Sequence, residues 1–253
     1  MAGRPWTREE VLVAFNIYCR TPFGRLHARN AEIIRVAKSL GRTAGALAMK
    51  CCNLAAFDPA LQERGIKGLR KVAKVDREVW QSFHDDPEQT GFESELEYSA
   101  AVGDVIRIAD RVEWQDIEGL DRQALTKVRV NQQLFRSIVL TGYAHKCAIC
   151  CLPIRQLLIA AHIVPWSVDK KNRMNPHNGL CLCALHDRAY DAGIVHVDEA
   201  YIVRLTDEVA QYRGDVSVQR FLLHYEGARI SLPERWLPEP ALLRAHGELI
   251  KAR

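Results

Sequence analysis

Apolar residues recur three and four positions apart through much of the first 84 residues, which is the spacing of one face of a helix. The segment from Thr7 to Tyr18 begins with a capping residue followed by acidic residues, and it carries this pattern until Pro22 interrupts it. The same periodicity predicts helices over Asn30–Leu40, Thr43–Leu54 and Asp76–Phe83. Residues 1–84 are therefore predicted to form a helical domain.

Two of these predicted helices, Asn30–Leu40 and Thr43–Leu54, are joined by a short turn that contains Gly41. The layout resembles the second and third helices of helix-turn-helix and Myb-like domains. This resemblance implies that the block binds DNA. The alternative is a helical domain with a purely structural role, because amphipathic helices joined by a glycine occur in many folds. The residues expected at the DNA-reading face are Arg42, Thr43, Lys50 and Asn53.

From Asp85 the chain becomes acidic, and Pro87 and Gly91 interrupt any regular pattern. Residues 81–120 hold eleven Asp and Glu against two Lys and Arg, whereas residues 1–80 carry a net charge of +8 and residues 121–253 a net charge of +5. We therefore interpret residues 85–120 as an acidic connector. Two basic blocks favour a polyanionic partner, since Lys and Arg facing phosphates release counterions; the alternative is ordinary solvated charge.

The pattern changes beyond the connector. After a helical repeat that reaches Thr141, a short apolar run over Leu157–Ile163 suits a buried strand that ends before Pro165. The predicted fold class is therefore α+β, with a second domain over residues 121–253. Its remaining predicted elements are a loop (Val168–Asn178), a strand (Gly179–Leu182), a helix (Ala184–Ala192) and a hairpin (Ile194–Val197 with Tyr201–Leu205).

Length and composition limit the setting in which the chain works. At 253 residues it is long enough for two ordinary domains. No stretch approaches the roughly 18 uninterrupted apolar residues that a membrane helix requires. The N-terminal residues turn polar at once, without the apolar core of a signal peptide. We therefore expect a cytoplasmic protein that does not associate with a membrane.

The chain has eight cysteines, and in a reducing compartment metal ligation or burial is favoured over disulfide formation. Five of them lie between Cys147 and Cys183, which indicates a site. Cys147 and Cys150 have the spacing of a zinc knuckle. The alternative is that these are small buried side chains, as free cysteines often are.

The predicted core, Tyr143–Val197, contains an ordered set of motifs. Ala160–Pro165 is Ala-Ala-His-Ile-Val-Pro, Asn178–Leu180 is Asn-Gly-Leu, and His186 precedes the Tyr-Asp-Ala-Gly of Tyr190–Gly193. The combination resembles the HNH (ββα-metal) endonuclease family, in particular the subgroup with the pattern Ala-Ala-His-Ile-x-Pro, Asn-Gly-Leu, His and Phe/Tyr-Asp-x-Gly. The resemblance implies a metal-dependent DNA endonuclease with a strand–loop–strand–helix core.

The resemblance also implies roles for individual residues. His162 would be the general base that deprotonates the attacking water, a task suited to an imidazole at neutral pH. Asn178 would hold the ring of that base in its working orientation. A catalytic Mg²⁺ or Mn²⁺ would neutralise the charge that develops on the phosphate. His186 is the leading protein ligand for this ion.

Two departures from the family pattern leave the catalytic ligands open. Many HNH enzymes place an Asp or His immediately before the base, where this chain has Ala161. Counting from Asn178, Asp187 rather than His186 occupies the position where many HNH enzymes have their helical ligand. His186, Asp187 and Asp191 therefore all stay candidates for the catalytic ion.

Zinc-stabilised HNH domains supply a second pair of zinc ligands near the start of the helix. Cys183 has the position of the first member of that pair, and either His186 or Cys181 would complete a site with Cys147 and Cys150. If His186 is a zinc ligand, Asp187 is the expected ligand of the catalytic ion.

The overall arrangement resembles prokaryotic restriction or defence endonucleases, including enzymes that require modified bases. Double-stranded DNA is the expected partner, and a homodimer is the simplest way for one HNH site per chain to cut both strands. The first alternative is a catalytically silent, zinc-containing DNA-binding regulator, which Ala161 favours. The second is a nuclease for structured RNA.

Overall fold

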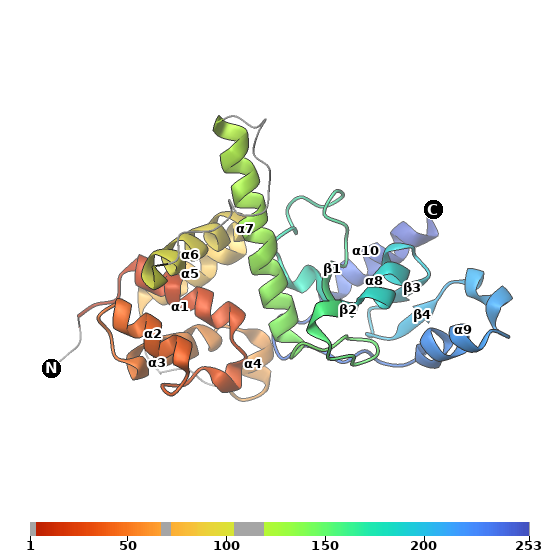
Figure 1. Ribbon diagram of the computed structural model, residues 1–253, viewed down its shortest axis with the longest axis horizontal. Coiled ribbons are helices and arrows are strands. Elements are labelled where there is room, and N and C mark those ends of the chain that lie inside the picture. Colours follow the sequence, from red (N-terminus) through yellow and green to blue (C-terminus); the bar gives the residue numbers. More distant parts are fainter. Residues whose placement is uncertain (1–3, 67–71, 104–118, 253) are drawn as a thin grey trace. The chain divides into compact units, whose positions relative to one another are not determined.

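The computed structural model describes residues 4–66, 72–103 and 119–252. The chain divides into two compact units, Met1–Ile138 and Val139–Arg253, and helix α7 runs across the division between them. Figure 1 shows the first unit as helical, whereas the second combines short strands and helices. The predicted α+β class is confirmed at that level.

All the elements that the structure describes in the first unit are helices. They are α1 (Arg8–Arg20), η1 (Phe23–Arg25), α2 (Ala31–Ser39), α3 (Ala44–Ala55), α4 (Pro59–Glu63), α5 (Lys74–Asp85), α6 (Pro87–Val102) and the start of α7 (Gly119–Gly142). The four helices predicted from periodicity correspond to α1, α2, α3 and α5.

Helix α1 forms the centre of this unit, because every residue from Glu10 to Cys19 is buried. It packs against α3, α5 and α6, and it begins with a capping box in which Thr7 and Glu10 satisfy each other's backbone N–H groups. The Phe15 ring lies 6.4 and 4.8 Å, centroid to centroid, from the rings of Trp80 and Phe83. The apolar periodicity along α1 and α5 thus corresponds to a shared aromatic core.

Helix α6 corrects the predicted connector, since residues 87–102 are helical and pack on α1. Its Pro87 lies in the first turn, where proline costs no helical hydrogen bond. The buried face includes Gly91 and Ser94, and the Ser94 hydroxyl accepts a hydrogen bond from Asn16. The first unit therefore extends past residue 84 and past residue 120, to 138; the predicted connector over residues 104–118 lies outside the described residues.

The acidic charge of α6 is matched by basic residues of α1. Glu93 pairs with Arg8 at 2.8 Å, and Glu95 pairs with Arg20. Both ion pairs join α1 to α6. Some of the charge in the basic and acidic blocks therefore serves packing within the first unit.

The second unit is built around two antiparallel hairpins. Its elements are η3 (Arg155–Leu157), β1 (Leu158–His162), η4 (Pro176–Asn178), β2 (Gly179–Cys183), α8 (Ala184–Asp191), β3 (Val195–Val197), β4 (Val203–Leu205), η5 (Asp207–Tyr212), α9 (Val216–Phe221), η6 (Leu223–Tyr225) and α10 (Pro240–Lys251). The predicted strands and helix of this region are confirmed, with boundaries that differ by a residue or two.

Strands β1 and β2 pair so that Leu158 lies opposite Cys183 and His162 lies opposite Gly179. Helix α8 follows β2 without a loop and packs against both strands, beside which it lies in Figure 1. The result is a strand–loop–strand–helix unit that carries His162 at the end of β1 and Cys183 at the junction of β2 and α8. This matches the predicted ββα arrangement.

Helix α10 closes the unit by packing against β3. The His246 ring of α10 stacks on the Tyr190 ring of α8 at 3.9 Å with an interplanar angle of 9°.

Within the described residues, no helix combines the length and the apolar character needed to cross a membrane.

Candidate metal centre and general base

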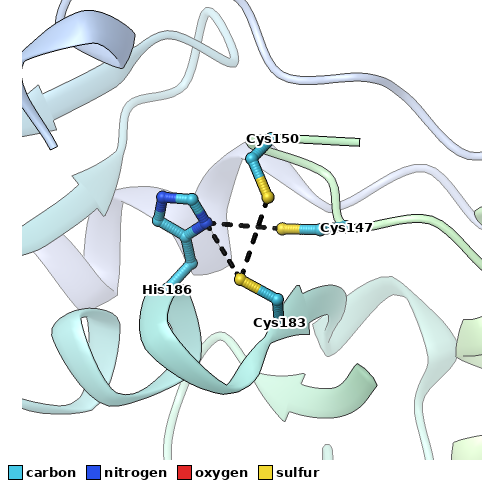
Figure 2. Close-up of side chains that lie close together, drawn as sticks. All are labelled: Cys147, Cys150, Cys183 and His186. Carbon is cyan, nitrogen blue, oxygen red and sulfur yellow. Dashed lines mark hydrogen bonds between the residues drawn. The ribbon is translucent and has the colours of Figure 1, made fainter. Parts of the chain in front are cut away.

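Three cysteines and one histidine converge in the second unit. The ligand atoms of Cys147, Cys150, Cys183 and His186 all lie within 4.8 Å of one another. Figure 2 shows the four side chains pointing toward a common centre, two from the turn after α7 and two from the start of α8. We call this set the Cys3His cluster.

Backbone contacts bring the two halves of the cluster together. In the turn after α7, the Cys151 amide bonds to the Cys147 carbonyl, and the Ala148 amide bonds to the Cys181 carbonyl of β2 at 2.7 Å. Cys183 is the N-cap of α8, so His186 lies three positions into the helix and on the same side. The turn is thereby fixed against β2, next to the first turn of α8.

The distances within the Cys3His cluster fit a tetrahedral zinc ion. The sulfurs of Cys150 and Cys183 are 3.8 Å apart, and His186 Nδ1 lies 3.2 Å from the Cys183 sulfur and 3.6 Å from the Cys147 sulfur. Zinc bonds of about 2.3 Å to sulfur and about 2.0 Å to nitrogen give tetrahedral edges of about 3.8 Å (S–S) and about 3.5 Å (S–N). The donor set and its spacing therefore suit Zn²⁺.

The second nitrogen of His186 supports the same conclusion. His186 Nε2 lies 3.1 Å from the Phe221 carbonyl oxygen, which only accepts, so this nitrogen must carry the proton. The neutral ring then presents its lone pair at Nδ1, the atom that faces the cysteine sulfurs. Such a bond to a backbone carbonyl is a common second-shell contact of zinc-bound histidines.

The cluster also favours a thiolate at the start of α8. A hydrogen bond from the Cys147 side chain, together with contacts to the side chain and backbone of His186, lowers the pKa of Cys183 to about 3. The same hydrogen bond and burial raise the pKa of Cys147. Metal binding requires deprotonated cysteines, so the cation would displace the remaining thiol protons.

The position of His186 decides between the alternatives that the sequence leaves open. His186, and not Cys181, completes the donor set with the three cysteines. Its role as a ligand of the catalytic ion, which the motif favoured, is therefore corrected: the ring is turned toward the cysteines. The predicted ligands Cys147, Cys150 and Cys183 are brought together as expected.

His162 lies at the end of β1 and is half-buried. Its Nε2 is 3.0 Å from the carbonyl oxygen of Arg173, which requires the proton to be on Nε2 and leaves the lone pair of the neutral ring on Nδ1. Burial lowers the pKa of His162 below its ordinary value of 6.5, against the opposing effect of the Arg173 carbonyl. The neutral, basic form is thus favoured near pH 7.

Asn178 acts on the loop rather than on the imidazole ring. It is fully buried; its Oδ1 accepts from the Val164 amide at 2.8 Å, and its Nδ2 donates to the carbonyls of Val164 and Asn172. These bonds clamp the two ends of the loop that carries Arg173. The hydrogen bonds of Asn178 thus go to the loop, and the group that contacts the His162 ring is the Arg173 carbonyl, which was not predicted from the sequence.

Two carboxylates lie one helical turn apart on α8. Burial, and then the charges of Asp191 and Cys183, raise the pKa of Asp187 to about 6. Asp187 is half-buried and Asp191 is exposed. A half-buried carboxylate with a like charge nearby gains from a bound cation. Many HNH enzymes have a metal ligand at the position of Ala161. This residue is buried, and its side chain has no atom that can bind a metal ion.

The residues predicted to read DNA are mostly engaged in packing. Lys50 forms a buried ion pair with Asp76 at 2.6 Å, and Asn53 is buried. The Arg42 side chain, which is 7% exposed, pairs with Glu10. This burial corrects their assignment to a DNA-reading face.

Thr43 is exposed, but its hydroxyl caps α3 by accepting from the Ala46 amide. The turn between α2 and α3 contains Gly41 with a φ of 62°, a backbone conformation that favours glycine. Such a tight turn is consistent with the helix-turn-helix layout. DNA binding by the first unit stays a prediction that these side chains do not support.

Comparison with known families agrees with the geometry of the second unit. Residues 140–198 match the HNH endonuclease family (HNH_2), nearly the same span as the core predicted from the motifs. The search among curated proteins found no match for the chain. The family match supports nuclease activity on DNA, and HNH domains depend on a metal ion.

Proposed function

We propose that the second unit is a metal-dependent HNH endonuclease domain that hydrolyses phosphodiester bonds of double-stranded DNA. The observation that carries this proposal is the state of His162 within the family-matching segment. Its ring is fixed by a backbone carbonyl, its pKa is lowered, and its lone pair is on Nδ1. A positioned neutral imidazole is what a general base at neutral pH requires.

In the proposed mechanism, Nδ1 of His162 takes a proton from the attacking water. The Arg173 carbonyl keeps the opposite nitrogen protonated and stabilises the imidazolium that forms, because it accepts a bond from a positively charged ring. The water oxygen attacks phosphorus, the bond to the 3′-oxygen breaks, and that oxygen takes up a proton from solvent to leave as a hydroxyl. Asn178 contributes by holding the loop on which that carbonyl lies.

Asp187 and Asp191 are the proposed ligands of the catalytic cation. Carboxylate oxygens suit Mg²⁺ or Mn²⁺, and the half-buried carboxylate of Asp187, whose pKa is raised chiefly by burial, would gain from a bound cation. When bound, such a cation supplies charge stabilisation at the phosphate and the leaving oxygen. The Cys3His cluster is proposed to hold a separate structural zinc ion, whose complete protein donor set leaves no position for substrate.

Within this function, the proposed type is a prokaryotic restriction or defence enzyme that acts as a homodimer, a class that includes enzymes requiring modified bases. Its support is the motif pattern of residues 160–193 together with the need to cut two strands with one HNH site per chain. The alternative function, a zinc-containing DNA-binding regulator without catalysis, is favoured by Ala161, which offers the catalytic cation no ligand.

The test compares cleavage of unmodified, methylated and hydroxymethylated plasmid DNA by the wild type, His162→Ala and His162→Gln. We expect the wild type to cleave at least one substrate with Mg²⁺ or Mn²⁺, and both variants to lose about a hundred- to ten-thousandfold in rate. His224→Ala removes an exposed histidine and serves as the matched control.

The metal requirement is tested by omitting the divalent ion while the zinc content of the protein is measured. Loss of cleavage with unchanged zinc separates the catalytic ion from the structural one. Equal cleavage by wild type and His162→Gln would remove His162 as the base. Absence of cleavage in all three proteins, with DNA binding retained, would favour the regulator. A structured RNA is offered in parallel with the plasmids, and its preferential cleavage would show that RNA is the substrate.

A further inference from the structure

We propose that the guanidinium of Arg173 binds a backbone phosphate of the nucleic acid and thereby positions the strand against His162. This inference rests on the proposed function and adds to it a substrate-positioning residue. Arg173 lies in the loop between β1 and η4, and its main chain already contacts the candidate base: the carbonyl oxygen is 3.0 Å from His162 Nε2. The side chain of the same residue therefore starts beside the reacting group.

Two contacts hold the Arg173 side chain in place. Its Cζ atom lies 4.7 Å from the centre of the Trp166 ring, and its Nε donates to the Trp166 carbonyl at 3.2 Å. Stacking on an aromatic face leaves the edge of a guanidinium available for hydrogen bonds. The side chain is thus positioned before any ligand binds, which reduces the entropy lost on binding.

The terminal nitrogens of Arg173 have no hydrogen-bond or ion-pair partner among the described residues. The nearest carboxylate in sequence, Asp169, is engaged in its own turn: it accepts from Asn172 Nδ2 at 2.6 Å and from the amides of Lys171 and Asn172. These hydrogen bonds satisfy its oxygens within the loop. A positioned guanidinium with unused donors suits a phosphate, which accepts two parallel N–H bonds.

The loop that carries Arg173 is internally braced. Asn175 donates to Asn172 Oδ1 at 2.8 Å, and Asn178 donates to the Asn172 carbonyl at 3.2 Å. Lys170 and Lys171, next to these residues, are exposed, and their side chains take no part in this bracing. Asn178 also bonds to Val164, just after β1, so the bracing connects the loop that carries the guanidinium to the strand end that carries His162. A phosphate bound by Arg173 would therefore have a defined position relative to the base.

A phosphate contact predicts a specific binding behaviour. Removal of the charge should weaken binding to any DNA sequence about equally and reduce the slope of log affinity against log salt by about one. The same change should lower kcat/KM by about ten- to hundredfold, as for the loss of a hydrogen bond between charged groups. The effect should appear in KM as well as in kcat.

The experiment uses the full chain with Arg173→Gln and Arg173→Lys, and Lys171→Gln as the control for loss of an exposed charge on the same loop. Affinity for a fluorescent DNA duplex is measured between about 50 and 200 mM salt in the His162→Ala background, which prevents cleavage. Cleavage kinetics are measured in the wild-type background. Zinc content and the midpoint of thermal unfolding confirm that each variant is folded.

We expect Arg173→Gln to bind DNA more weakly, with a smaller slope of log affinity against log salt. Arg173→Lys should keep that slope but lose part of kcat/KM. Lys171→Gln should cleave like the wild type. Equal losses in Arg173→Gln and Lys171→Gln would overturn the proposal, because loop charge alone would explain them. If the wild type cleaves and Arg173→Gln cleaves equally well, this inference fails and the nuclease assignment stands. If the wild type neither binds nor cleaves any nucleic acid, both fail.

Discussion

Replacing Cys150 by serine should remove the metal from the Cys3His cluster and unfold the segment around it. Cys151 offers an adjacent control: it is exposed, lies outside the cluster, and its sulfur is 3.2 Å from the Ser231 hydroxyl. Cys150→Ser and Cys151→Ser change the same atom at neighbouring positions. Only the first takes away a ligand.

The magnitude follows from how little else supports this segment. Strands β1 and β2 have five residues each and α8 has eight, and a two-stranded hairpin or a helix of that length is marginal by itself. Structural zinc contributes about 10–16 kcal/mol in small zinc peptides, as much as the whole stability of an ordinary domain, about 5–15 kcal/mol. Even a partial loss should lower the unfolding midpoint of the second unit by at least about 10 °C.

The assay combines metal analysis with differential scanning calorimetry. We expect one zinc per chain in the wild type and in Cys151→Ser, and much less in Cys150→Ser. The transition of the first unit should persist in all three proteins, since its core does not include the cluster. A wild type that is purified with zinc in the medium yet contains none would refute the metal centre, as would equal zinc content in the two variants.

Two further predictions concern protonation and buried charge. Because burial lowers the pKa of His162, the acidic limb of kcat/KM, measured at saturating divalent ion, should lie below pH 6.5, and an acidic limb above that value would contradict the role of the neutral ring. The lowered pKa of His162 also makes the free energy of unfolding depend on pH. Its contribution is fully present above pH 6.5, where the ring is neutral in both the folded and the unfolded chain. It is lost as pH falls through the folded pKa, because the unfolded chain takes up the proton first. Lys50→Met should destabilise the first unit by about 3–5 kcal/mol in urea unfolding, because it leaves Asp76 buried without its cation. The double variant Lys50→Met/Asp76→Leu should recover most of that loss, and failure to recover would show that packing rather than charge is responsible.

The sequence predicted elements whose signals are local. The strand–loop–strand–helix core follows from an apolar run that ends at Pro165 and from Asn178-Gly179, and its boundaries agree with β1, β2 and α8. Helix α6 was missed because its buried face contains small and polar residues, such as Thr90 and Ser94, so that no apolar period marks it. Its glycine and proline then indicated a connector.

The side-chain roles that the sequence did not predict depend on contacts between distant residues. Lys50 looks like an exposed cation until Asp76, 26 residues away, is found beside it. Likewise, the choice between His186 and Cys181 as the fourth ligand depends on where β2 ends and α8 begins, since the N-cap position of Cys183 puts His186 on its side. The bond between Arg173 and His162 required the closure of a loop, which no spacing rule gives.

The hydrogen bond between His186 Nε2 and the Phe221 carbonyl has a consequence for the order of events on the ribosome. The first 138 residues emerge before any ligand of the Cys3His cluster, so the helical unit can fold while the remainder is still being made. All four donors are available once residue 186 has emerged, but the group that fixes the histidine tautomer follows 35 residues later. A nascent chain that bound a metal ion before that point would do so without the Phe221 carbonyl, which in the folded unit contacts the ring of His186.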